Sequence, residues 1–564
     1  MQFLTITFLS FIFTIFLTQY LIRFLTKKGI LDRPNGEKRR MHENPVPRMG
    51  GLVIVSVVLF ITFLFYQDLW SKKFFLTGVF LVFTIGLWDD LKDKKWYVKI
   101  LFQTAAAHFL ILSLNANGFS IITFAGYTIP SGFNYVILLF LIVGIINAFN
   151  MLDGLDGLVI GLTVIISGMC FLLSLDKNLV FIPIMSAALI GSSMGFLKFN
   201  ANPARIFLGD SGSLFLGYTL AGFLLVISSG EVYQPSAVLQ SKAFSVDILF
   251  LIIVLAVPIT DTLRVMTLRM KNKRSPFLPD TNHLHHILYS KRIRHKTVVL
   301  LINTLSALFA LTGVYYLNFS KIPALILFGF LLGMLLNASR IIDFVIRKEN
   351  LLTIGRMYRL VPANIPVLYR KFLLPALGVV TLLLMFLLLL YEIERYQSYY
   401  LYLLIFQIPA LAYAVVVFRR NNYYVDLIVF LNLIIFFAIT GLNGFFYKMY
   451  PVPYIMQINI NQIFILLFSA VVILFILFKE RIANLRTQFL TGVDLSIALS
   501  IVFVFLLSLL LDIPSAYRIS DTLLRSFLLF LFYKIIITTF PRFHFSLHFT
   551  SFAVSLASLL RTAM

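Results

Sequence analysis

The sequence has very little cysteine and few acidic residues. Cys170 is the single cysteine among 564 residues, so a disulfide within the chain and a cysteine-based metal cluster are both excluded. Cys170 lies in the apolar run 168–173, where a packing role is expected. Asp and Glu together number 24, against 47 Lys and Arg. A place where several carboxylates gather is therefore unusual for this chain and indicates chemistry.

The composition excludes a soluble domain. Hydrophobic residues make up 60% of the chain, and its mean hydropathy is +0.93. Apolar runs of about 20 residues, long enough to cross the hydrocarbon core, recur from end to end. We therefore expect an all-α polytopic membrane protein with about 11 helices before residue 346 and about 6–7 further ones after residue 371. The expected spans lie near 1–25, 49–67, 73–88, 99–114, 133–149, 157–175, 179–197, 212–229, 246–268, 297–317, 321–345, 372–391, 399–418, 424–446, 461–478, 489–511 and 521–540, with a last apolar stretch near 543–560.

The net charge of +23 does not indicate nucleic acid, because the cations lie in loops between spans. They concentrate after the first and ninth expected spans, so the positive-inside rule makes that side cytoplasmic and the N-terminus external. A plasma membrane is the expected location. The first apolar run is interpreted as a retained span, since it lacks a basic start and a small-residue cleavage site. Segment 117–131 mixes Gly and Pro with β-formers, which predicts a small external hairpin.

Acidic, amide and imidazole side chains gather in four short segments between the spans. They are Asp89 and Asp90; Asn147, Asn150, Asp153 and Asp156; Asp210; and His283, His285 and His286. Each segment follows an odd-numbered span, so counting alone places all four on the cytoplasmic side. The sequence therefore predicts one shared site at a single membrane face.

These residue types favour a hard cation. Oxygen ligands in this number suit Mg²⁺, with Mn²⁺ as the variant, bound through one or two carboxylates and substrate phosphates. Asp210 stands between glycines just before a span, where backbone donors at the helix start can hold a phosphate. A zinc site is the rival interpretation of the histidines.

Each segment also has a structural explanation. Asp89 and Asp90 fit interfacial charges, Asn147 and Asn150 fit polar contacts between helices, and Asp210 fits a helix N-cap. Arg48 fits a topological charge or a substrate contact. In the later spans, the charged residues have no visible partner cluster and are interpreted as interfacial or snorkelling side chains. They are Lys448, Asp494, Arg525 and Lys534.

Taken together, the motifs resemble the polyprenyl-phosphate N-acetylhexosamine-1-phosphate transferases, the membrane family of glycosyltransferase type 4. The resemblance covers roughly residues 1–345. It rests on Pro45-Val46-Pro47-Arg48-Met49-Gly50-Gly51, Asp89-Asp90, the Asn-x-x-Asn-x-x-Asp-Gly-x-Asp-Gly run at 147–157, Gly-Asp-Ser-Gly-Ser at 209–213 and His-x-His-His at 283–286. The His spacing favours the branch that uses UDP-N-acetylhexosamines over the peptidoglycan branch, which uses UDP-MurNAc-pentapeptide.

The resemblance implies that a polyprenyl phosphate attacks the β-phosphate of a UDP-sugar and that UMP leaves. It implies metal contacts for Asn150 and Asp210. Catalytic roles are expected for Asp89, Asp90, Asp210, His283, His285 and His286. Substrate contacts are expected for Asn147, Asn150, Asp153, Asp156, Arg48 and Arg264.

The resemblance also divides the chain. Residues 1–345 are the expected transferase domain, 346–371 a basic cytoplasmic linker, and 372–564 a membrane module without a recognisable motif. The expected partners are a polyprenyl phosphate, a UDP-N-acetylhexosamine and the bilayer, with a homodimer left open and no nucleic acid. The peptidoglycan enzyme stays open as an alternative, as does a cation-coupled transporter or flippase, which would bind coupling cations without breaking a bond.

Overall fold

A computed structural model describes most of the first 347 residues and part of the remainder. The described residues are 2–32, 45–92, 94–116, 119–233, 242–273, 275, 283–291, 293–347, 449–452, 456–459, 465, 468–469, 472, 492–511 and 519–539. The chain divides into two compact units, and each is described by itself. The larger contains residues 6–344 and 495–511, and the smaller contains residues 1–5, 345–494 and 512–564.

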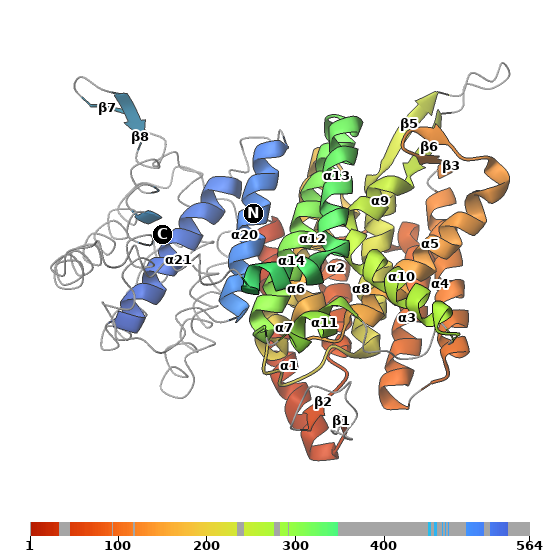
Figure 1. Ribbon diagram of the computed structural model, residues 1–564, viewed down its shortest axis with the longest axis horizontal. Helices are drawn as coiled ribbons and strands as arrows, with labels where there is room; N and C mark the ends of the chain where they lie inside the picture. The colour runs from red at the N-terminus through yellow and green to blue at the C-terminus, as the bar shows by residue number, and fades with distance from the viewer. Residues whose placement is uncertain are drawn as a thin grey trace. The chain divides into compact units, whose positions relative to one another are not determined.

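Helices dominate the larger unit. They are α1 (Gln2–Lys28), α2 (Gly51–Phe65), the short 3₁₀ helix η1 (Leu69–Lys72), α3 (Lys73–Leu91), α4 (Trp96–Ala116), α5 (Ser131–Leu152), α6 (Leu158–Asp176), α7 (Phe181–Asn200), α8 (Gly209–Ile227), α9 (Ile248–Val254), α10 (Ala256–Lys271), α11 (Leu284–Ser290), α12 (His295–Asn318), α13 (Lys321–Leu336), α14 (Ala338–Arg347) and α20 (Gly492–Leu510). Figure 1 shows the long helices of this unit side by side.

The predicted polytopic helical fold is confirmed in outline. Eight described helices are long and apolar enough to cross a membrane, and up to ten spans result if each of two bent pairs counts as one. The bent pairs are α9 with α10, at 85°, and α13 with α14, at 68°. Each range expected before residue 346 contains a helix or a bent pair, but α2 is shorter than a usual span. The exact number of spans stays a prediction.

Helix α8 lies inside the helical bundle of the larger unit. It packs against α2, α3, α5 and α6. In its most apolar stretch of 18 residues, 94% of the residues are buried, whereas in that of α4 the share is 33%. A helix that is apolar on every side is typical of a buried position. The first residue after its N-terminal glycine, Asp210, is therefore held at a fixed place among its neighbours.

Glycines let two backbones approach the first turn of α8. A Cβ added at Gly51 of α2 would lie 2.0 Å from the backbone nitrogen of Gly212. One added at Gly86 of α3 would lie 2.5 Å from the Cα of Ser211. Side chains at these two positions would force the helices apart, so the glycines bring the ends of α2 and α3 to the start of α8.

We expect Gly51→Ala to destabilise the protein, because the new methyl meets backbone that cannot rotate away. The loss should be about 3 kcal/mol of unfolding free energy, at the upper end for overpacking. Thermal unfolding of the purified chain in detergent measures it. Gly144→Ala is the matched control, since nothing lies within 4 Å of a Cβ there, and it should change stability by about 1 kcal/mol or less. Equal melting temperatures for the two variants would contradict this packing.

The predicted hairpin is confirmed, and it is part of a larger sheet. Strands β3 (Phe119–Phe124) and β4 (Tyr127–Thr128) pair antiparallel. Strands β5 (Ser229–Tyr233) and β6 (Lys242–Asp247), which we did not predict, extend it to the order β4-β3-β6-β5, with β3 and β6 parallel. A two-stranded pair, β1 (Leu31–Asp32) with β2 (Val46–Pro47), lies at the other end of the bundle from this sheet (Figure 1).

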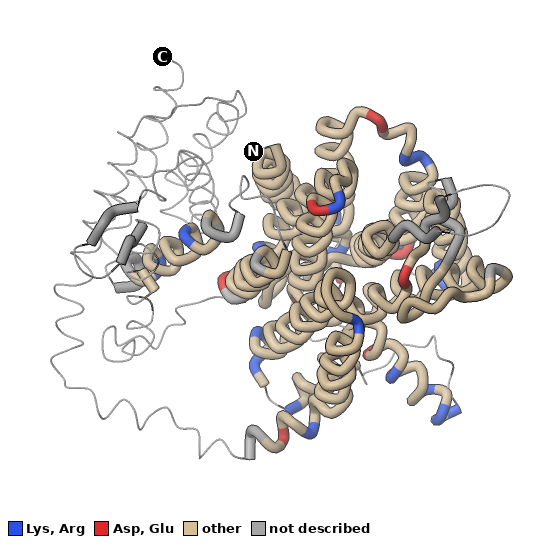
Figure 2. Tube along the Cα trace, turned by 90° about the horizontal axis from the view of Figure 1, so that it is seen from above, with Lys and Arg blue, Asp and Glu red and all other residues tan. Residues whose placement is uncertain are grey.

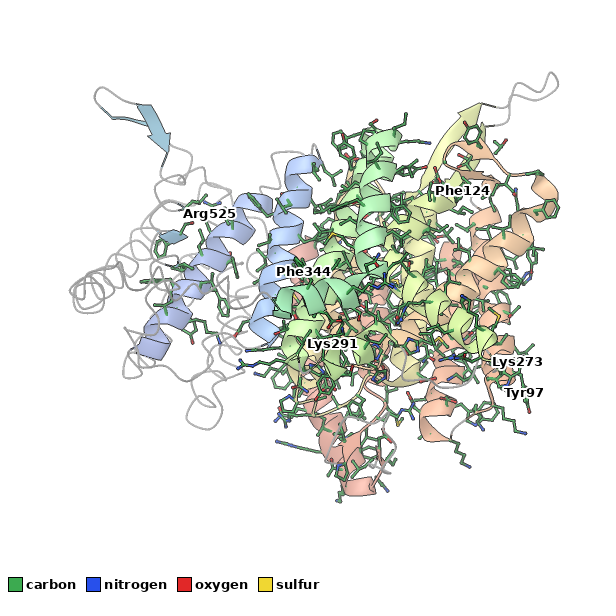
Figure 3. All side chains as sticks on the ribbon, viewed as in Figure 1. Tyr97, Phe124, Lys273, Lys291, Phe344 and Arg525 are labelled. Atoms are coloured by element: carbon green, nitrogen blue, oxygen red, sulfur yellow. The ribbon has the colours of Figure 1, made fainter. Side chains whose placement is uncertain are left out.

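Helix α14 turns away from α13 and is held to the segment after α11. The Lys291 ammonium lies 2.5 Å from an Asp343 carboxylate oxygen and 3.0 Å from the Ser339 carbonyl oxygen. Figure 3 labels Lys291 and also Phe344 of α14, which is 58% exposed. Polar residues of α14 therefore contact the bundle, while apolar ones stay exposed.

The described part of the smaller unit corrects one prediction. Strands β7 (Met449–Val452) and β8 (Met456–Asn459) form a hairpin, and helix α21 (Ile519–Thr539) carries Arg525 and Lys534. Lys534 lies 3.3 Å from Asp494, both side chains are nearly inaccessible, and Arg525 is fully buried. The interpretation of these three as separate snorkelling residues is wrong. Lys448 lies outside the described residues, as do most of the predicted spans between 372 and 478.

Charges are sparse along the described helices. Figure 2 shows most of their length without Lys, Arg, Asp or Glu, with the coloured positions mainly near helix ends and turns. In a low-dielectric bundle, a buried charge needs a partner. The buried charges at the ends of α3 and α8 therefore mark the candidate site of reaction.

Candidate active site

The N-terminus of α8 is capped by a carboxylate from α3. Asp90 accepts hydrogen bonds from the backbone N–H of Asp210 at 2.8 Å, from the N–H of Ser211 at 3.1 Å, and from the Ser211 hydroxyl at 2.6 Å. The first N–H groups of a helix have no partner within it, and a carboxylate is favoured there. Gly209, with φ +77, allows this contact, since a Cβ would lie 2.6 Å from the Asp90 oxygens.

This cap corrects the expectation that the start of α8 presents backbone donors to a phosphate. The N–H groups of Asp210 and Ser211 are already taken by Asp90. The Ser213 hydroxyl donates to the Gly209 carbonyl at 3.1 Å, one turn earlier in α8. In this structure, anion binding at the site therefore depends on side-chain cations rather than on these two helix N–H groups.

Two cations lie against the carboxylates. Lys99 from α4 contacts both Asp210 and, at 3.3 Å, Asp89. Arg48 lies 3.5 Å from Asp90 and 3.5 Å from Asp210. Arg48 follows β2, and the backbone on either side of it is hydrogen-bonded to Phe207, which holds it beside the start of α8. The structure thus places Arg48 within the carboxylate cluster. Lys99 was not predicted.

Accessibility separates the three aspartates. The Asp90 side chain is 0% exposed, Asp89 is 7% exposed and Asp210 is 11% exposed, while Lys99 and Arg48 are 19% and 29% exposed. Asp90 is occupied by its capping hydrogen bonds. Asp89 and Asp210 are the carboxylates that can meet a ligand, with both cations at the open side.

The last turn of α5, with Asn150, and the loop that follows it to Gly157 border the same cluster. The Asn150 amide donates to the Ser213 hydroxyl at 3.0 Å, so it lies beside the first turns of α8. Asp156 accepts from the Asn202 amide at 2.9 Å and from the Ala204 N–H at 3.1 Å, and these contacts fix the loop to the segment after α7. The structure brings Asn150 to the site and gives Asp156 an anchoring contact.

Asn147 makes a contact between helices. Its amide nitrogen donates to the Gln103 side-chain oxygen at 2.6 Å and to the Val143 carbonyl at 2.9 Å, and Gln103 donates back at 3.4 Å. Gln103 is fully buried in α4. Such amide pairs hold membrane helices together. A substrate contact for Asn147 stays a prediction.

The histidine segment is organised by a residue that we did not predict, Asp261 of α10. His283 Nδ1 lies 2.8 Å from one Asp261 oxygen. The other oxygen accepts from the Leu284 N–H at 2.7 Å and from Arg264 at 3.0 Å. Asp261 thus joins two predicted site residues, His283 and Arg264, at the start of α11.

His285 connects this segment to the loop after α5. It is 1% exposed, and its ring lies between those of His283, at 5.6 Å, and His286, at 4.4 Å. A Cβ added at Gly154 would lie 2.4 Å from its Nε2. Neither ring nitrogen has a hydrogen-bond partner among the described residues. The histidines and the 153–157 loop therefore pack together.

Electrostatics supports one connected site. Burial raises the pKa of Asp153 to about 8, and the negative charges of Asp210 and Asp90 add to this effect against the attraction of Arg48. Burial tends to lower the pKa of Arg48, but Asp210 and Asp90 outweigh it and the net direction is upward. Burial lowers the pKa of His285 to about 3, which keeps this ring neutral near pH 7. Asp153 prefers a proton or a cation nearby.

The two missed residues had weak signals in the sequence. Lys99 was counted as the start of an apolar span, although it lies ten residues after Asp89. Asp261 lies well inside the stretch expected to cross the membrane, three residues before Arg264. An ionisable residue within a span is a functional candidate by default, and that rule would have found both.

The residues present fit a divalent cation in charge and in chemistry. Three carboxylates, of Asp89, Asp90 and Asp210, contact the two cations Arg48 and Lys99, an excess of one negative charge when all are ionised. Asp153, which interacts electrostatically with Asp210 and Arg48, adds a second negative charge when it is ionised. Among the residues that the structure describes, no group of three His, Cys, Asp or Glu side chains is ready to hold a metal. A cation with few protein ligands and substrate phosphates suits Mg²⁺ better than Zn²⁺.

Comparison with known proteins points to one family. Residues 73–228 match the family model described as glycosyl transferase family 4. A Bacillus subtilis protein named probable undecaprenyl-phosphate N-acetylglucosaminyl 1-phosphate transferase is 32% identical over 307 residues, 54% of this chain and 82% of the relative. The decaprenyl-phosphate N-acetylglucosaminephosphotransferase of Mycobacterium leprae is 33% identical over 286 residues, 47% of this chain and 72% of the relative.

A third relative is more distant and covers the same share of this chain as the first. The undecaprenyl-phosphate α-N-acetylglucosaminyl 1-phosphate transferase of Escherichia coli K12 is 26% identical over 313 residues, 54% of this chain and 81% of the relative. The matched part includes the ends of α3 and α8, where the carboxylates and Lys99 meet. On this evidence the chain belongs to glycosyl transferase family 4.

Proposed function

We propose that the chain transfers N-acetylhexosamine 1-phosphate, with GlcNAc as the sugar, from a UDP-sugar to a polyprenyl phosphate such as undecaprenyl phosphate. UMP leaves, and the product starts a cell-envelope polysaccharide at the membrane. The observation that carries this proposal is the meeting of Asp89, Lys99, Arg48 and Asp210 from four separate segments. The relatives named for this reaction support the choice of substrates.

In this reaction an oxygen of the lipid phosphate attacks the β-phosphorus of the UDP-sugar. The bond from that phosphorus to the bridging oxygen breaks, and the oxygen leaves with UMP. A phosphate monoester is largely ionised near neutral pH, so the attack needs little help from a base. Arg48 and Lys99 hold the phosphates and stabilise their charge, which is the usual contribution of the protein in phosphoryl transfer. Asp89 orients Lys99, and Asp90 positions the start of α8.

Mg²⁺ is the proposed cofactor, with Mn²⁺ as a substitute. Asp210 and Asn150 would hold it, since Asp210 is the most exposed of the three clustered aspartates and Asn150 lies beside the same turns of α8. When bound, it would neutralise the charge of the diphosphate and of the leaving phosphate. The positive charge of the bound cation would also favour the ionised form of Asp153. His283, His285, His286 and Arg264 would contact the nucleotide sugar.

The proposed site faces the cytoplasm, where nucleotide sugars are made. The carboxylates lie at the C-terminal end of α3 and the N-terminal end of α8, away from the four-stranded sheet. The positively charged loops lie at the same end of the sequence-predicted spans. The N-terminus then lies outside. A homodimer stays a prediction.

The test is UMP release by purified chain in detergent with UDP-GlcNAc, Mg²⁺ and undecaprenyl phosphate. We expect release only when the lipid phosphate is present and a loss of release with EDTA. UDP-GalNAc and UDP-MurNAc-pentapeptide are the competing donors, and preference for the pentapeptide would establish the peptidoglycan reaction instead. No release with any donor, together with cation-driven flux across sealed vesicles, would establish the transporter alternative.

A further inference from the structure

The carboxylate of Asp261 has a geometry that fixes the protonation of a neighbouring imidazole. An ionised carboxylate is only an acceptor. Its Oδ1 already accepts from the Leu284 N–H and from Arg264, and its Oδ2 lies 2.8 Å from His283 Nδ1. For that contact to be a hydrogen bond, Nδ1 must carry the proton. The nitrogen left for other contacts is Nε2.

We propose that Asp261 is a positioning residue for the transfer reaction, which holds His283 with its proton on Nδ1 and aims Arg264 beside it. This inference rests on the proposed function. Asp261 is 4% exposed, so water does not compete strongly for its oxygens. The His283 ring and the Arg264 guanidinium are therefore fixed relative to each other by the two oxygens of one carboxylate.

Asp261 also fixes the start of helix α11. Asp261 lies in α10, which follows a bend of 85° after α9. The Leu284 N–H that donates to Asp261 belongs to the first turn of α11. One carboxylate therefore fixes both the ring of His283 and the start of α11. The side chain of His285, one residue further on, stacks on His283 at 5.6 Å with nearly parallel rings. A displacement of His283 would therefore move both rings.

Asp261→Asn is the decisive variant, because the amide has the same shape and can keep the Leu284 contact. Its NH₂ group would face Nδ1 and donate to it, which forces the proton onto Nε2. We expect kcat/KM for UMP release to fall by about 100-fold, the lower range for a positioned acid–base or charged group.

Asp247→Asn is the matched control. Asp247 is also buried, its carboxylate also accepts a helix-start N–H, from Leu249 at 3.0 Å, and it also binds a ring group, the Tyr316 hydroxyl at 2.7 Å. It lies at the end of β6, on the four-stranded sheet. Asp247→Asn should lower the melting temperature as much as Asp261→Asn does, with kcat/KM within about 3-fold of the unmodified chain.

A double variant tests whether Asp261 acts through His283. In a His283→Ala background, Asp261→Asn should cost about 5-fold or less, since coupled residues are not additive. Two results would overturn the inference while the proposed function stands: a single Asp261→Asn variant within about 3-fold of the unmodified chain, or the same cost in both backgrounds. Absence of UMP release by the unmodified chain would overturn the proposed function first, and this inference with it.

Discussion

Replacing Asp210 by asparagine is expected to lower kcat for UMP release on the order of 1,000-fold, the upper range for loss of one charged group at a reacting centre. Asp210 contacts both cations of the site, Arg48 and Lys99, and is the proposed ligand of Mg²⁺. The change keeps the size of the side chain and its helix-start position. Turnover at saturating UDP-GlcNAc, with the thermal stability of the same preparation, measures the effect.

Asp90→Asn separates reaction from positioning. Asp90 accepts three hydrogen bonds at the start of α8 and is fully buried. The NH₂ group of the asparagine would face hydrogen-bond donors that need an acceptor. This variant should therefore melt at a lower temperature, with a loss of about 1–3 kcal/mol of unfolding free energy. Asp210→Asn should lose less stability than Asp90→Asn, because Arg48 keeps Asp90 and Lys99 keeps Asp89 as a partner. If Asp210→Asn kept more than about a tenth of kcat, the assignment of Asp210 to the reaction would fail.

Lys99→Met is expected to give the second large effect, a fall in kcat of about 100-fold or more, because a cation that holds phosphate is lost. The ammonium also joins Asp89 and Asp210, and removing one partner of a buried ion pair leaves uncompensated charge. Mg²⁺ should then raise the melting temperature of Lys99→Met more than that of the unmodified chain. Turnover and thermal shift against Mg²⁺ concentration check the two parts.

Lys177→Met is the control for Lys99. Lys177 is also partly buried, but it donates to the carbonyl oxygens of Ile227 at 2.6 Å and Ser229 at 3.1 Å, at the C-terminal end of α8. Its loss should reduce stability without changing kcat or the response to Mg²⁺. A Mg²⁺ response of Lys99→Met no larger than that of Lys177→Met would contradict the place of Lys99 among the carboxylates.

The sequence allowed the helical fold and the meeting of the acidic segments to be predicted, because both depend on long-range regularities. Apolar runs repeat over about 20 residues, and alternation of sides follows from counting them. The contacts of single charges do not follow from such counting. Lys99 and Asp261 stand inside predicted spans, and only the packing of α4 and α10 shows which carboxylate or imidazole each one meets.

The strands β5 and β6 and the bend between α9 and α10 were also not predicted from the sequence. Strands β5 and β6 are five and six residues long, and they lie mostly between the expected spans 212–229 and 246–268, where no strand was predicted. Strand β6 pairs with β3, a segment more than 100 residues earlier, and β5 joins the sheet by pairing with β6. The bend between α9 and α10 falls at Leu255, and Pro258 in the first turn of α10 cannot donate a hydrogen bond to the Val254 carbonyl. Tertiary contacts decided the strand pairing, whereas Pro258 was a local signal for the bend.

The bond network between Asp90 and the start of α8 has a consequence for the lipid environment. Membranes of different thickness change the tilt of the helices that cross them. Because α3 and α8 are joined at one end by three hydrogen bonds and a close glycine contact, we expect them to tilt as a pair. The distance between Asp89 and Asp210 should then depend little on bilayer thickness, so that the geometry of the reacting centre tolerates changes in lipid composition.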